Sequence, residues 1–305
     1  MLACKHYGVF IMNCLSTAKR VQVVAALVEG VSINATSRMT GVSKGAILRL
    51  VADLGQACAE YHDEHVRGVR VRRLQADEIW SFVGAKKKNA NDEQKQAGWG
   101  DAWTWTGIDA DTKLCVSYLV GLRDKGCAFE FIQDCADRII GRPQITTDAL
   151  KSYPDAIEAA FGADCDYAQM HKIYGVSNEP ETRYSPATCI GADMKVISGN
   201  PDPKHVSTSY VERQNLTMRM HMRRFTRLTN GFSKKIENHT HAIALHFMYY
   251  NFCKVHQTLR VTPAMEAGLT DHVWTLEELC ALLPQKKAEK STIEEEMILK
   301  ALEIV

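Results

Sequence analysis

The 305-residue sequence has no apolar run that approaches the roughly 20 residues needed by a membrane-spanning helix. Its 10 cysteines form no CxxC pair and its 11 histidines form no HExxH pair, which argues against zinc sites built on either residue type. A signal peptide, internal repeats and low-complexity tracts are also absent. These absences predict a globular, cytoplasmic protein with no membrane partner and with reduced, mostly buried thiols.

The net charge of +1 hides two segments of opposite charge. Residues 212–235 contain seven Lys or Arg and one Glu, whereas residues 271–305 contain four Lys and eight Asp or Glu. A small net charge therefore does not argue against a nucleic-acid partner, because the basic segment can bind one locally.

Residues 17–51 have the pattern of three short helices. Apolar residues recur at helical spacing before Gly30, which is expected to end the first helix. Ser32 and Ser43 suit the N-caps of the second and third helices, and a tight turn at residues 40–42 separates these two. The pattern predicts a helix-turn-helix, although a plain three-helix bundle would give the same periodicity.

In a helix-turn-helix, the helix after the turn faces the DNA bases with its N-terminal residues. Ser43, Lys44 and Arg49 are therefore the candidates for DNA contact in this region. A separate, charged linker helix is expected over about 53–68.

The pattern changes to strands after residue 73. Strands are expected over 74–83, 102–108, 114–120, 144–147 and about 167–173, with helices over 127–140 and 154–161. This βββαβαβ order, followed by a further helix, predicts an α/β fold with a ribonuclease-H-like core and a mixed five-stranded sheet. Residues 174–208 are rich in Gly, Pro, Ser and Asn, and we expect them to form an insertion or active-site loop.

Three acidic residues have positions that suit a metal site. Asp77 lies in the first expected strand, Asp148 ends the fourth, and Glu212 begins a helix. The first and fourth strands are expected to be neighbours, so the two aspartates would meet below the helix that carries Glu212. Carboxylate oxygens suit Mg²⁺, and two such ions support in-line displacement at phosphorus.

Each acid also has an ordinary explanation. Asp77 would be unremarkable at a strand edge, Asp148 as a turn cap and Glu212 in a first helical turn. Asp109 and Asp111 are rival ligands, but their turn composition explains them. Strand alternation is expected to turn Glu78 to the face opposite Asp77.

The helix expected after residue 210 has a basic face. Arg219 and Arg223 fall within about 20° of Glu212 at 100° per residue. Arg224 and Arg227 continue the basic segment, and we expect all four arginines to contact a DNA backbone.

Three segments together resemble a known family: Ala76 to Val83, Thr146 to Asp148, and especially Ser207 to Asn215. They are similar to the DDE motifs of insertion-sequence transposases of the insertion-sequence-one group, and Tyr250 to Pro263 is similar to the segment that closes many such catalytic domains. The resemblance runs from about residue 15 to 283. Relatives begin near Met12, so residues 1–11 are expected to reflect an upstream start site.

The resemblance implies a ribonuclease-H-like core in which Asp77, Asp148 and Glu212 bind two Mg²⁺ or Mn²⁺ ions. It also implies double-stranded DNA partners, both element ends and target DNA, with a homodimer or higher oligomer in the synaptic complex and a bacterial, nucleoid-associated location. Typical members carry a cysteine-paired zinc finger, which Cys4 and Cys14 alone do not provide.

The expected division is an N-terminal extension (1–16), a helix-turn-helix region with linker helix (17–68), a catalytic domain (72–265) and a C-terminal helical tail (266–305). The expected function is a transposase that binds terminal inverted repeats and catalyses metal-dependent strand cleavage and transfer. The alternatives are a catalytically silent or domesticated DNA-binding protein and a structure-specific nuclease.

Overall fold

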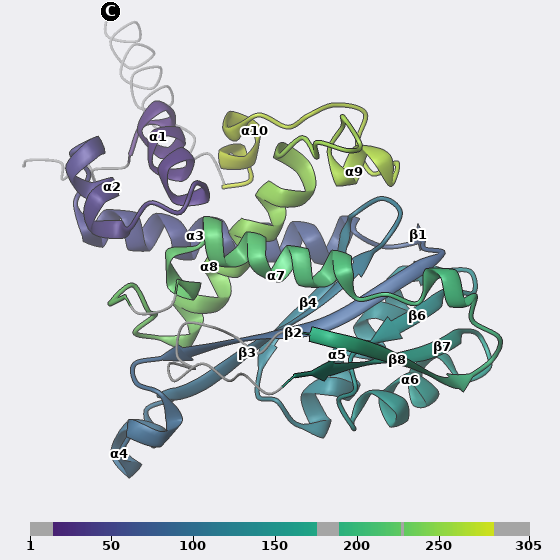
Figure 1. Cartoon of the computed structure of the whole chain (residues 1–305). Helices are drawn as coiled ribbons and strands as arrows, with labels where there is room; N and C mark the ends of the chain where they lie inside the picture. The colour runs from purple at the N-terminus through teal and green to yellow at the C-terminus, as the bar shows by residue number, and fades with distance from the viewer. Residues whose placement is uncertain (1–14, 176–188, 227–228, 284–305) are drawn as a thin grey trace, which may run out of the picture.

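The computed structural model describes residues 15–175, 189–226 and 229–283 (Figure 1). Its centre is a six-stranded mixed sheet with the order β4-β3-β2-β6-β7-β8. The strands are β2 (Arg73–Val83), β3 (Gly100–Asp109), β4 (Cys115–Gly121), β6 (Gln144–Thr147), β7 (Asp166–Tyr174) and β8 (Cys189–Ser198). β2, β6 and β7 are parallel neighbours, and the remaining pairs are antiparallel. A separate pair joins β1 (Val69–Arg70) to β5 (Ile139–Ile140).

Five of the six strands were expected from the sequence, and the sixth was not. β8 occupies the second half of the stretch predicted to be a loop, so the prediction of a five-stranded sheet was wrong. Its apolar residues alternate with Asp193 and Lys195, which is a strand pattern, but the Gly- and Pro-rich residues on either side conceal it. Residues 176–188 of that stretch lie outside the described residues.

Helices cover both faces of the sheet (Figure 1). α5 (Lys125–Arg138) and α6 (Tyr153–Phe161) lie on one face, close to their predicted positions. α7 (Ser209–His221) lies on the other face, where α8 (Ile236–Met248) also packs. The short elements are η1 (Lys87–Asn89), α4 (Asp92–Gln96), η2 (Pro203–His205), η3 (Arg223–Phe225), η4 (Tyr249–Cys253), α9 (Pro263–Glu266) and α10 (Leu276–Ala281).

The N-terminal region forms α1 (Thr17–Val28), α2 (Ile33–Thr40) and α3 (Lys44–His65). Ser32 and Ser43 are N-caps as predicted, because their hydroxyls accept from the Ala35 and Ala46 amides at 3.2 and 3.3 Å. The prediction of a separate linker helix was wrong, since α3 is one helix of 22 residues. Its buried side chains continue at helical spacing past Val51 through Leu54 to Cys58, so nothing interrupts the helix there.

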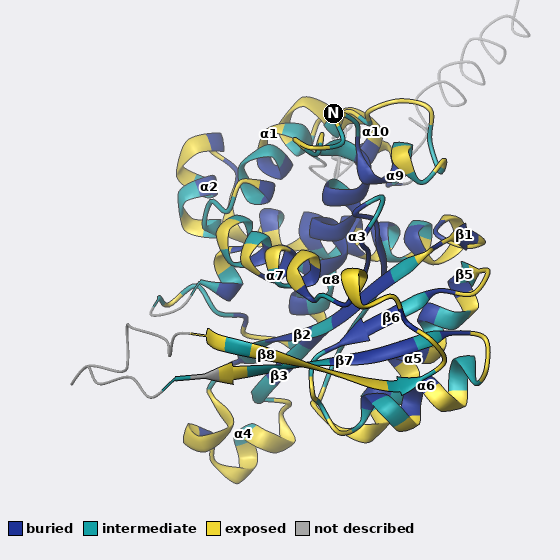
Figure 2. Ribbon diagram, turned by 45° about the vertical axis from the view of Figure 1, so that its right-hand side comes forward, coloured by how far each residue is buried: buried dark blue, intermediate teal, exposed yellow. Residues whose placement is uncertain are grey.

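α3 packs directly on α8, the helix that follows the basic segment. Gly55 permits this approach, since a Cβ at that position would lie 2.3 Å from the carbonyl oxygen of His241. Buried side chains of α1, α3, the sheet and α10 belong to one continuous core cluster (Figure 2). The division into residues 17–68, 72–265 and 266–305 stays a prediction.

None of the helices in the described parts of the chain combines the length and apolar character that crossing a membrane requires. The eight cysteines among these residues are unpaired, and five of them are buried. Cys4, Cys14 and Met12 lie outside the described residues.

Candidate active site

The parallel pairing of β2 with β6 brings two of the predicted ligands together. Ala76 is paired with Thr147, so Asp77 and Asp148 are the next residues on two neighbouring strands. The predicted adjacency of the first and fourth strands is therefore confirmed. Both side chains are half-buried.

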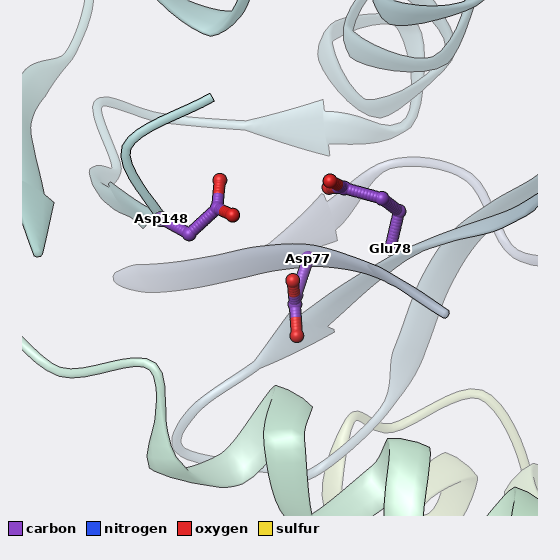
Figure 3. Close-up of side chains that lie close together, drawn as sticks. All are labelled: Asp77, Glu78 and Asp148. Atoms are coloured by element: carbon purple, nitrogen blue, oxygen red, sulfur yellow. The ribbon is translucent and has the colours of Figure 1, made fainter. Parts of the chain in front are cut away.

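A third carboxylate, Glu78, joins these two aspartates. One oxygen from each of Asp77, Glu78 and Asp148 lies within 4.8 Å of the others. Figure 3 shows Asp77 and Glu78 leaving β2 in different directions, with the Glu78 carboxylate turned toward Asp148. The prediction that Asp77 and Glu78 start on opposite faces of β2 is therefore confirmed, and the length of the glutamate side chain still lets its carboxylate reach the two aspartates.

Two neighbours fix the Glu78 carboxylate. The Arg123 Nε donates to one oxygen at 2.6 Å, and the Tyr153 hydroxyl donates to the other at 3.0 Å. The Glu78 side chain is only 1% exposed, so this buried charge is compensated mainly by Arg123. The Arg123 guanidinium also lies 3.8 Å from Asp148 and over the Trp103 ring.

The three carboxylates disfavour one another's ionised forms. The pKa of Asp77 is raised to about 7, first by burial and then by the charges of Glu78 and Asp148. Burial also raises the pKa of Glu78 and that of Asp148, with further contributions from Asp148 and Glu212 respectively. A bound cation would relieve this repulsion.

The N-terminal end of α7 is attached to β2 by one side chain. The Gln75 Oε1 accepts from the Tyr210 amide at 2.8 Å and the Val211 amide at 3.2 Å, which satisfies two donors of the first helical turn. Val211 and Met218 then bury against β2 and β3 in a second apolar cluster. These contacts set the distance between α7 and the carboxylates.

Glu212 and Asn215 face the site from α7. The Asn215 Nδ2 donates to Asp77 Oδ2 at 2.8 Å, while its buried Oδ1 has no protein partner among the described residues. Glu212 is held by Lys172 of β7 and by the Thr208 hydroxyl, and it does not belong to the close group of three. The Glu212 charge nevertheless acts on the site, because it raises the pKa of Asp77 and that of Asp148.

The basic face of α7 is shorter than expected. The helix ends at His221, so Arg219 lies on α7 but Arg223 lies beyond it, in η3. The predicted alignment of Arg223 with Glu212 on one continuous helix was wrong. Met222 is the residue that interrupts the helix, with an extended backbone and a buried side chain.

Arg224 and Arg227 complete the predicted basic segment. The Arg224 guanidinium donates to the Ser233 hydroxyl at 2.9 Å, and burial lowers its pKa to about 10. Arg227 lies outside the described residues. Arg223 is exposed.

Ser43, Lys44 and Arg49 are all exposed on the first turns of α3. Of these three residues, Lys44 lines a cavity of about 520 Å³ between α3 and the chain that follows α7. Its lining includes apolar residues such as Leu48 and Leu245, and the charged residues Lys44, Arg223 and Lys234. The predicted helix-turn-helix and the basic segment therefore border one hollow.

The rival ligands Asp109 and Asp111 have structural roles. Asp109 accepts from the amides of Asp111 and Thr112 and from the Thr112 hydroxyl, which closes the turn between β3 and β4. Asp111 forms an ion pair with Arg73. The turn explanation is confirmed for the Asp109 side chain, whereas Asp111 lies in the turn and its side chain pairs with Arg73.

The donor set suits a hard divalent cation. It offers three carboxylates within 4.8 Å, a fourth carboxylate on α7 and the free Asn215 carbonyl oxygen nearby. The Asn215 side-chain oxygen is buried and has no partner among the residues that the structure describes, as expected for a group that meets an ion or its water shell. Asp77, Glu78 and Asp148 would hold the ion.

Sequence reasoning found Asp77 and Asp148 but missed Glu78 and its partner Arg123. The adjacency of Asp77 and Glu78 was a usable signal, because two neighbouring acids in an apolar strand are costly to bury. No local pattern marked Arg123, which comes from the turn between β4 and α5.

No protein-family model matches the sequence. A search of curated proteins finds no match. A solved structure with some similarity is the cryo-electron-microscopy structure of a piggyBac transposase synaptic complex with hairpin DNA. It has a TM-score of 0.39 and 9% sequence identity, and the match covers 92% of this chain and 74% of that one. A similarity this slight supports no argument about function, and no match supports the insertion-sequence-one group.

Proposed function

We propose that the chain is a divalent-cation-dependent DNA transposase of the DDE type, which cleaves a phosphodiester and joins the resulting end to target DNA. The observation that carries this proposal is the convergence of Asp77, Glu78 and Asp148 where β2 and β6 lie side by side. The motif resemblance around Asp77, Asp148 and Glu212 supports the same reading.

A bound Mg²⁺ or Mn²⁺ ion would supply activation of a water or 3′-hydroxyl and stabilisation of the leaving oxygen. The protein's own residues prepare the site for it. Arg123 holds Glu78 in place, Asn215 orients Asp77, and Lys172 keeps Glu212 beside the cluster rather than in it. Glu212 is the fourth carboxylate available to a second ion.

Basic residues on α7, η3 and α3 would contact the DNA backbone. Arg219 lies on the same helix as Glu212, and Arg223 and Lys44 line the cavity between the α7 segment and α3. We propose that the DNA backbone follows these cations and that Ser43 and Arg49 contact the duplex beyond them. Binding would then weaken as salt concentration rises.

A plasmid that carries the genomic DNA flanking this gene on both sides, mixed with a supercoiled target, tests the proposal. We expect Mg²⁺- or Mn²⁺-dependent nicking and joining, with a loss of about a hundred-fold or more in Asp148→Asn. Asp155→Asn is the matched control, because Asp155 forms an exposed ion pair with Lys125.

Cleavage that is unchanged in Asp148→Asn would overturn the site assignment. Metal-dependent cleavage without joining would identify a nuclease, and binding without either reaction would identify a silent DNA-binding protein.

A further inference from the structure

The edge strand β8 presents an exposed apolar row. Ile190, Met194 and Val196 are 69%, 39% and 49% exposed. Ala192, Met194 and Val196 alternate along the regular part of β8 and share one face of the strand, whereas Ile190 lies at the register shift between Gly191 and Cys189. Figure 2 shows β8 as a largely exposed strand.

β8 also has an unpaired backbone edge. It is the last strand of the sheet and pairs only with β7 among the residues that the structure describes. Long edge strands with apolar side chains are templates for pairing with another chain.

We infer that β8 pairs antiparallel with β8 of a second copy of this chain, in a register centred on Met194, to give a two-fold homodimer with one continuous sheet. The charges of Asp193 and Lys195, on either side of Met194, favour a second copy of β8 as the partner and favour this register. Centring on Met194 places Asp193 of each copy opposite Lys195 of the other, so two opposite-charge pairs form. Centring on Asp193 or Lys195 would place a charge opposite itself.

The two-fold axis of such a pairing is perpendicular to the sheet, so both copies present the same sheet face to the same side. The exposed apolar row that contains Ala192 and Met194 lies on the same face of the sheet as Lys172, because Lys172 is the cross-strand partner of Ala192. Lys172 binds Glu212, so the two candidate active sites would open on one side of the combined sheet. The dimer itself does not depend on the proposed function.

A strand of this length spans about 33 Å, and one strand pair is small beside the roughly 1,200–2,000 Å² of stable interfaces. The dimer therefore forms in a concentration-dependent equilibrium. A different reading of Asp193 and Lys195 is that they protect the edge from pairing. The two interpretations predict opposite effects of reversing one charge on dimer formation: weaker dimerisation if the charges attract, and no loss of dimerisation if they protect the edge.

Sedimentation of the full chain over a range of concentrations tests the inference. We expect a monomer–dimer equilibrium in the natural protein and a dissociation constant about ten-fold higher or more in Asp193→Lys and in Lys195→Asp, since each change turns two attractions into repulsions. The double variant D193K/K195D restores both pairs in swapped order, and its dissociation constant should return to within a few-fold of the original.

Glu93→Lys, on exposed α4, makes the same charge change away from β8 and should leave the equilibrium unchanged. Thermal unfolding of each variant checks that the fold is intact. A natural protein that is monomeric at every concentration overturns the inference. A dimer that both single variants leave unaffected also overturns it, as does a double variant no better than either single one.

Discussion

At the residue scale, the buried Glu78 carboxylate depends on a partially exposed arginine. Arg123 comes from the turn between β4 and α5, and it is the cation that directly contacts Glu78 among the described residues. A buried carboxylate that loses its only cation keeps the full cost of desolvation. Arg123 is therefore expected to offset much of the cost of burying the Glu78 carboxylate.

Arg123→Ala should lower the free energy of unfolding by about 1–3 kcal/mol, a figure below that of a fully buried pair because 39% of the Arg123 side chain is exposed. Urea unfolding measures this loss. The double variant R123A/E78Q should recover most of it, since no unpaired charge stays buried. A double variant less stable than R123A would mean that Arg123 acts through packing on Trp103 instead.

At the element scale, the contact between α3 and α8 joins the N-terminal helices to the rest of the molecule. It depends on Gly55, where the backbone of α8 leaves no room for a side chain. Gly45 lies in the same helix, and a Cβ added there would meet no atom within 4 Å, which makes it a natural control.

Gly55→Ala should destabilise the protein by about 1–3 kcal/mol through overpacking, as thermal or urea unfolding will measure. Gly45→Ala should be neutral or stabilising by up to about 1 kcal/mol, because alanine favours the helix. Equal stability of the two variants would contradict the close approach of α3 and α8.

Helices and strands with a strong hydrophobic periodicity were predictable from the sequence. Elements whose ends depend on contacts with distant parts of the chain were not. The alternation of β2 and the capping serines Ser32 and Ser43 are local signals, and each predicted its element. β8 was missed because its flanking composition resembles a loop. The end of α7 at His221 was missed because the buried Met222 packs against a cluster assembled from other elements.

The same distinction applies to the site. The proximity of Asp77 and Asp148 follows from strand order, since parallel pairing of β2 with β6 places the two positions side by side. Glu78 does not follow from it, because the Arg123 and Tyr153 contacts that fix its carboxylate come from other parts of the chain.

At the scale of the whole molecule, buried neutral histidines link stability to acidity. His62 is almost fully buried between α3 and β4, and its Nε2 lies 3.2 Å from the Cys115 carbonyl oxygen. Burial, followed by the charge of Arg138, lowers the pKa of His62 to about 4. In the unfolded chain, the pKa of His62 is the ordinary value near 6.5.

Because the pKa of His62 is lowered in the folded protein, its contribution to the free energy of unfolding is fully present above about pH 6.5. That contribution is lost as the pH falls toward 4. His62→Gln keeps an N–H for the Cys115 carbonyl but does not titrate. Between pH 7 and pH 4, the natural protein should lose about 1–3 kcal/mol more of its free energy of unfolding than the variant. Parallel losses in the two proteins would show that His62 does not carry this dependence.

The central claim is that Asp77, Glu78 and Asp148 form a divalent-cation site. Titration of Mn²⁺, followed by electron paramagnetic resonance at pH 8, tests it most directly, because Asp77 with a pKa of about 7 is then mostly ionised. We predict saturable binding in the natural protein and in Asp155→Asn, and its loss in D77N/D148N. Binding by D77N/D148N that equals that of the natural protein, or no saturable site in the natural protein, would contradict the claim.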